Sequence, residues 1–153
     1  MAYHSHHILD IGDMYERLLE LHVSGKEATV PLFSTVTGER VASEFQFGPK
    51  YWRDNLESPV PFNTTVQGIL DELAPGAIFL EIEPHSALQG PLREIFRAKT
   101  DKRPNYVPTL VRGSDAVESA LRVVRQLLTH GYPIDLSYIN PETPVLTDLP
   151  KYP

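Results

Sequence analysis

The sequence contains no cysteine among its 153 residues. Without thiols it can form neither a disulfide framework nor a zinc site built on cysteine ligands. It also lacks any apolar run near the roughly 18 to 20 residues that a membrane span needs, and it has no basic segment followed by an apolar one that would mark a secretion signal. We therefore expect no membrane partner and a cytoplasmic location.

Basic residues are few and scattered along the chain. Lysine and arginine total 14 against 20 aspartate and glutamate residues, which gives a formal net charge of -6 at pH 7. Proteins that bind nucleic acid need clustered positive charge to neutralise phosphates. A nucleic-acid partner is therefore not expected.

Two catalytic signatures are missing as well. No serine lies in the G-x-S-x-G pattern of a nucleophile elbow, and the glycine-rich phosphate-binding loops are absent. Ser24, Ser86 and Ser114 instead occupy positions typical of turns or helix caps. The sequence therefore contains no activated nucleophile of its own.

What is present is an alternation of predicted strands and helices, in a chain of the size of one domain. Apolar spacing and turn residues predict helices over 8–23, 49–56, 63–73, 86–98 and 115–131, and strands over 30–36, 77–82 and 106–110. This alternation is typical of an α/β fold in which helices are layered on a mostly parallel sheet. The nearly continuous apolar run over 77–82 favours a strand covered on both faces.

Two of the predicted helices carry apolar stripes that we expect to be buried against a core. Ser114 is expected to cap the second of them. The first stripe comprises Ile11, Tyr15, Leu18, Leu19 and His22, and the second comprises Val117, Ala120, Leu121, Val124 and Leu128.

The composition changes after Gly131, where prolines begin to recur through to Pro153. The aromatic and leucine side chains of this stretch would stay exposed to water in a free linker. We therefore expect an extended segment that lies along a surface. The predicted organisation is one domain over 1–131 followed by a linker over 132–153.

Three histidines, His4, His6 and His7, stand just before the first predicted helix. A metal site is not expected, because His7 would not share a strand face with the other two and no acidic or cysteine pattern completes a ligand set. Acid–base chemistry is a second interpretation, since imidazole titrates near neutral pH. A third is that the histidines are exposed and have no role, and the residues alone leave these alternatives open.

A catalytic imidazole needs an acceptor that orients its second nitrogen. Asn55 is one candidate for this among several polar residues. His85 follows the apolar run 77–82 at a turn from strand to helix, where α/β folds often place functional residues. An ordinary turn histidine is an equally good interpretation of His85.

Six stretches together resemble the C-terminal half of the acyltransferase domain of iterative polyketide synthases, especially the fungal type, and of the related animal fatty acid synthase. They are 2–8 (AYHSHHI), 34–38 (STVTG), 51–60 (YWRDNLESPV), 79–88 (FLEIEPHSAL), 132–136 (YPIDL) and 146–153 (LTDLPKYP). They occur in the family's order through essentially the whole chain, with Glu83 in place of the family's usual glycine. The resemblance implies part of a layered parallel-sheet, hydrolase-like acyltransferase subdomain followed by an extended linker.

The resemblance also implies a double displacement. A serine takes an acyl group from coenzyme A as an ester and passes it to the phosphopantetheine thiol of an acyl carrier protein, with a histidine as the base in both steps. By motif position His4 matches that base, and Asn55 matches the residue whose carbonyl orients it. No bound cofactor is implied, because acyl-CoA is a substrate and phosphopantetheine belongs to the carrier.

Tyr3 matches the place where the family carries an aromatic residue when the extender unit is malonyl and a small residue when it is methylmalonyl. The physical reason is steric, since a ring fills the space of an α-methyl group. One methyl group in a pocket is worth about 1 to 3 kcal/mol, so Tyr3 predicts a preference for malonyl-CoA.

The family's nucleophilic serine, oxyanion donors, carboxylate-binding arginine and ferredoxin-like subdomain all precede the histidine motif, and they are not in this sequence. We therefore expect the base-bearing half of an acyltransferase, inactive and prone to oligomerise without its N-terminal half. The other expected partners are malonyl-CoA, an acyl carrier protein and neighbouring synthase domains. The alternatives are a non-catalytic α/β docking fragment within a megasynthase and a shortened gene product without an acyltransferase role.

Overall fold

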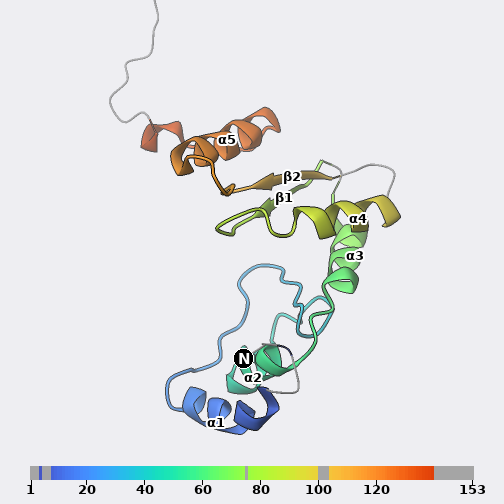
Figure 1. The fold of residues 1–153 in the computed structure, drawn as a ribbon, viewed down its shortest axis with the longest axis vertical. Helices are drawn as coiled ribbons and strands as arrows, with labels where there is room; N and C mark the ends of the chain where they lie inside the picture. The colour runs from blue at the N-terminus through green and yellow to red at the C-terminus, as the bar shows by residue number, and fades with distance from the viewer. Residues whose placement is uncertain (1–3, 5–7, 75, 100–103, 140–153) are drawn as a thin grey trace, which may run out of the picture. The chain divides into compact units, whose positions relative to one another are not determined.

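The computed structural model describes residue 4 and residues 8–74, 76–99 and 104–139. Its elements occur in the order α1 (Leu9–Glu20), α2 (Pro49–Glu57), α3 (Phe62–Glu72), β1 (Ile78–Glu81), α4 (Gln89–Lys99), β2 (Asn105–Pro108) and α5 (Ala116–Thr129), followed by a short 3-10 helix, Leu136–Tyr138 (Figure 1). The five predicted helices and the two later strands are therefore confirmed, with shifts of a few residues at their ends.

The chain divides into two compact units. The first covers 1–77 and 90–104 and holds α1, α2, α3 and nearly all of α4, whereas the second covers 78–89 and 105–153 and holds β1, β2 and α5. This division is spatial and does not test the predicted boundary between domain and linker at 131. Residues 140–153 of that linker lie outside the described residues.

In the first unit α1 and α2 pack side by side (Figure 1). Pro49 begins α2, where its fixed backbone angle suits the first helical position and its missing N–H costs nothing. Gly12 is the buried residue of α1, and it lets the two helices approach closely. A Cβ atom at Gly12 would come within 1.6 Å of Glu57 Oε1 and 2.8 Å of Glu57 Cδ.

The predicted strand over 30–36 is wrong. The segment forms a tight turn instead, in which Gly38 adopts a φ of 82° and donates its N–H to Ser34 O at 2.8 Å. Among the described residues, Phe33 and Arg40 make one isolated antiparallel bridge there. The chain reverses before a ladder of hydrogen bonds can extend. The β-branched and aromatic residues therefore flank a tight turn whose two arms are too short to count as strands.

The connection from α1 to α2 is held on α2 by aromatic side chains. Phe45, Phe47 and Tyr51 meet edge to face, with ring centroids 4.8 to 5.7 Å apart. Trp52 adds a hydrogen bond from Nε1 to Phe47 O at 3.1 Å, and the hydroxyls of Tyr51 and Ser34 lie 2.9 Å apart. These contacts link the turn at Ser34 to the helix that carries the YWRDNL motif.

In the second unit β1 and β2 pair in parallel, with Ile78 opposite Asn105 and Glu81 opposite Pro108. The predicted parallel arrangement is confirmed. Glu81, at the end of β1, is buried; its Oε1 accepts a hydrogen bond from Leu88 N at 2.9 Å, and its Oε2 accepts one from the Tyr106 hydroxyl. Burial, together with this carboxylate, raises the pKa of Tyr106.

The second unit also corrects two expectations about α5, which contacts β2. The N-cap is Asp115 rather than Ser114, and its carboxylate accepts from Glu118 N at 2.9 Å. Ser119 and Val123 are the buried residues of the helix, whereas Leu121 of the expected stripe is 45% exposed.

Exposed apolar faces recur on other elements. Leu18 of α1, expected in the core, is 51% exposed, and Leu80 of β1, expected to be covered, is 40% exposed. Apolar periodicity identifies which face of an element is apolar, but it does not supply the surface that covers it. The described residues leave these faces without a complete cover. None of the described helices is long and apolar enough to cross a membrane.

The close contact at Gly12 yields a stability prediction. Gly12→Ala displaces the Glu57 carboxylate from its ion pair with Arg53, an overpacking cost of about 1 to 3 kcal/mol. The helix propensity of alanine offsets up to roughly 1 kcal/mol of this cost, so the free energy of unfolding should fall by about 0 to 2 kcal/mol. Gly90→Ala in α4 is the matched control, since a Cβ atom there would meet nothing within 4 Å beyond the backbone of its own helix and its chain neighbours. There the change should be neutral or stabilising by up to roughly 1 kcal/mol. Urea unfolding measures both, and equal effects would contradict the proposed contact.

Candidate active site

His4 has an unusual backbone conformation for a non-glycine residue, with a φ of 58°. Among the described residues it is the one non-glycine residue with a positive φ. The left-handed region costs an L residue roughly 1 to 2 kcal/mol, because Cβ crowds the following carbonyl oxygen. Such conformations persist only where surrounding contacts hold them, and they cluster at functional sites.

Two main-chain carbonyl groups hold His4 in place. Its backbone N–H donates to Leu56 O at 3.1 Å, and its Nδ1 lies 3.0 Å from Ser58 O. A carbonyl oxygen can only accept, so the proton of this bond resides on Nδ1. In the neutral ring Nε2 is then unprotonated, and the side chain is exposed. This tautomer is the one that a general base needs.

The two carbonyl groups are available because α2 ends at this point. The last carbonyl groups of a helix have no partner within it. Ser58 leaves the helix with an extended backbone, and Pro59 cannot continue the ladder because it has no N–H.

Asn55 lies one turn before this end, within α2. The hydrogen bonds of His4 to the described residues run to Leu56 and Ser58 rather than to Asn55. The orienting role of Asn55 stays a prediction. The Ser58 carbonyl was missed because a main-chain acceptor can belong to any residue type. The available signal was the helix end that Pro59 predicts.

Of the other residues that the sequence singled out around the site, the structure describes His85. Tyr3, His6 and His7 lie outside the described residues. His85 is half-buried in the turn after β1, in the second unit. The described residues contain no group of three or more histidine or acidic side chains that could hold a metal ion.

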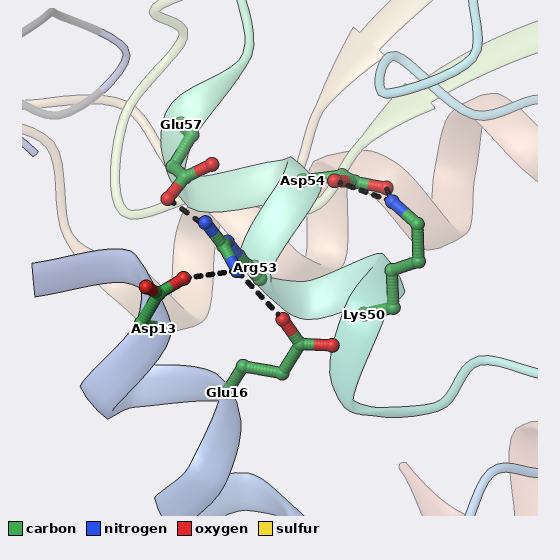
Figure 2. Close-up of polar contacts among 6 residues, drawn as sticks. All are labelled: Asp13, Glu16, Lys50, Arg53, Asp54 and Glu57. Atoms are coloured by element: carbon green, nitrogen blue, oxygen red, sulfur yellow. Dashed lines mark hydrogen bonds and ion pairs between the residues drawn. The ribbon is translucent and has the colours of Figure 1, made fainter. Parts of the chain in front are cut away.

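A four-residue ion network, formed by Arg53, Asp13, Glu16 and Glu57, lies beside the end of α2 (Figure 2). Arg53 Nη1 lies 2.6 Å from Asp13 Oδ1 and 2.9 Å from Glu16 Oε2, and Arg53 Nε lies 3.1 Å from Glu57 Oε1. The hydrogen bonds to Glu16 and then Glu57 raise the pKa of Arg53. The sequence alone did not indicate this network, which joins α1 to α2.

The sequence profile described as "Acyl transferase domain" matches residues 1–133. The chain belongs to this family. The highly reducing polyketide synthase gloL of Glarea lozoyensis is 45% identical over 152 residues, which are 99% of this chain and 6% of that protein. The highly reducing polyketide synthase g433 of a Fusarium species is 46% identical over 153 residues, which are 100% of this chain and 6% of that protein.

A solved acyltransferase shares the fold of this segment. The acyltransferase domain from module 8 of the salinomycin polyketide synthase has a TM-score of 0.75 at 28% identity, over 88% of this chain and 30% of that chain. The expected α/β acyltransferase fold with a parallel sheet is therefore confirmed. This acyltransferase segment spans about 6% of the length of the curated polyketide synthases that it matches.

The backbone of His4 allows a test that does not depend on catalysis. His4→Gly and His4→Ala both remove the imidazole, but only alanine keeps the Cβ that the left-handed conformation disfavours. The glycine variant should be more stable by about 1 kcal/mol. At His22, where φ is not positive, the same pair provides the control, and alanine should be at least as stable as glycine. A His4 pair that behaves like the His22 pair would contradict the strained conformation.

Proposed function

We propose that this chain carries the general base of an acyltransferase that moves a malonyl unit from coenzyme A to an acyl carrier protein. The observation that supports this most strongly is the contact of His4 Nδ1 with the Ser58 carbonyl at 3.0 Å. It leaves Nε2 unprotonated on an exposed ring, where it can reach a nucleophile that is not in this sequence. Membership of the acyl transferase family supports the reaction class.

In the proposed first half-reaction, His4 Nε2 takes the proton of a serine hydroxyl supplied from outside this sequence. The serine oxygen attacks the thioester carbonyl of malonyl-CoA, and the carbon–sulfur bond breaks. His4 gives its proton to the departing sulfur, so that coenzyme A leaves as the thiol and His4 is neutral again. In the second, His4 takes the proton of the carrier's phosphopantetheine thiol, which attacks the serine ester. The serine then regains its proton, and malonyl remains on the carrier.

The proposed partners follow from these two steps. Malonyl-CoA and the carrier protein are substrates, and no resident cofactor is required, because phosphopantetheine arrives on the carrier. The nucleophile-bearing half and the neighbouring synthase domains are the remaining partners. The exposed apolar side chains of α1 and α5, including Leu18 and Leu121, favour such partners because exposed apolar faces often mark interaction sites.

The same exposed faces favour one alternative, a non-catalytic docking fragment within a megasynthase. That function would need the apolar surfaces but not His4. The two functions are therefore separable by mutating the imidazole and the apolar face independently.

The test is to co-express the chain with a nucleophile-bearing acyltransferase half and to load it with labelled malonyl-CoA. The chain alone should transfer nothing to a carrier protein. In the complex, His4→Ala should lower transfer by roughly 100- to 10,000-fold, the range of general acid–base catalysis. His22→Ala, at another exposed histidine of the same unit, is the control and should transfer normally.

Two outcomes would count against this function. Malonyl loading by the purified chain alone would show that it does not depend on an external serine. Undiminished transfer by His4→Ala would remove His4 from the mechanism and would favour the docking fragment.

Extender selectivity is tested at Tyr3. Tyr3→Ala in the same complex should improve methylmalonyl transfer relative to malonyl transfer by roughly 10- to 200-fold, because space for one methyl group is opened. The measurement is a competition between the two acyl-CoA substrates, and Tyr3→Phe should keep the parent's ratio. An unchanged ratio in Tyr3→Ala would exclude Tyr3 as a selectivity residue.

A further inference from the structure

The left-handed backbone of His4 has to be maintained from outside, because an L residue does not favour it. The two described hydrogen bonds that could do so end on Leu56 O and Ser58 O. Both oxygens belong to the last turn and cap of α2. The position of His4 therefore depends on the position of that helix end.

The nine-residue helix α2 is too short to be stable alone in water. It packs along α1, and Gly12 brings the two helices close beside Glu57. Charged groups at this contact are partly buried: the side chains of Glu57 and Glu16 are 13% and 26% exposed. The contact therefore depends on how these carboxylates are neutralised.

Arg53 is the cation of this contact (Figure 2). Its guanidinium contacts Glu57 on its own helix through Nε and two carboxylates of α1 through Nη1, at distances between 2.6 and 3.1 Å. Without Arg53 the partly buried carboxylates of Glu16 and Glu57 would face each other across the helix contact, beside the exposed carboxylate of Asp13, and like charges in a partly buried site repel. Lysine could neutralise one of them, but it lacks the planar fork that serves several at once.

We propose that Arg53 is a positioning residue for His4: it fixes the end of α2 against α1, so that the Leu56 and Ser58 carbonyls hold the imidazole with Nε2 free. The role of His4 as a base rests on the proposed function, whereas its two hydrogen bonds to the end of α2 are observed independently of that function. The ion pairs that Arg53 makes among the described residues all run to carboxylates, so its effect on His4 is transmitted through the helix end.

The direct test measures the tautomer of His4 in the 15N-labelled chain by long-range proton–nitrogen correlation, at a pH where the ring is neutral. The parent should show the proton on Nδ1. Arg53→Met should shift the population toward the Nε2-protonated form, and Arg53→Lys should fall between the two. Lys50→Met is the matched control, because Lys50 lies on the same helix and pairs within it, with Asp54 at 2.8 Å. It should keep the parent's tautomer.

The proposal stays testable if Arg53→Met does not fold. Arg53→Lys and Glu57→Gln keep most of the network, and each should shift the tautomer partially. A parent-like tautomer in both of these variants, or in a folded Arg53→Met, would overturn the proposal. A shift of equal size in Lys50→Met would overturn it too, since the effect would then come from any loss of charge on α2.

Transfer kinetics in the complex with the nucleophile-bearing half separate this proposal from the proposed function. Arg53→Met should lower kcat by roughly 10- to 100-fold with KM for malonyl-CoA unchanged, because a small misplacement of a catalytic group has that effect. If His4→Ala transfers normally, the proposed function fails, whatever the tautomer shows. If His4→Ala is inactive while the Arg53 variants match the parent in tautomer and kcat, the positioning role alone fails.

Discussion

The hydrogen bond between the imidazole of His4 and the main-chain carbonyl of Ser58 is the contact on which the site depends. It fixes the tautomer of the ring and helps to hold a backbone conformation that His4 would not adopt freely. A helix that ended elsewhere would offer no free carbonyl at this place. Pro59 therefore matters to the site although it contributes no functional group.

Each unit contains polar contacts of a different kind that fix a helix or a turn. In the first unit Arg53 and three partly exposed carboxylates join α1 to α2. In the second the buried carboxylate of Glu81 takes hydrogen bonds from Tyr106 and from the main chain at Leu88, which secures the turn after β1. Burying a carboxylate without such donors would cost folding free energy. The end of β1 therefore depends on the turn that supplies the Leu88 N–H.

The exposed apolar faces of α1, β1 and α5 agree with what the comparisons show. The salinomycin acyltransferase matches 88% of this chain but only 30% of its own length. The part of the chain that the structure describes supplies only part of the surface that would cover these faces. Leu121 and Leu80 are exposed among the described residues, and exposed apolar faces often mark interaction sites.

The sequence alone determined the helices and the parallel pair, because apolar spacing and proline or glycine at the ends are local signals. It also pointed to His4, through a motif resemblance that spans the chain. It was wrong about the strand at 30–36, where the turn at Gly38 reverses the chain, and about the buried stripe of α5, since periodicity does not say what covers a face.

The tertiary structure decided the rest of the site. The Ser58 carbonyl is a main-chain group without a sequence signature. Two partners of Arg53, Asp13 and Glu16, lie on another helix, up to forty positions away. Only the packing of α1 on α2 brings these groups together. The motif resemblance could therefore point to His4 as the proposed base, but the groups that hold its imidazole depend on where helix ends and helix faces meet in space.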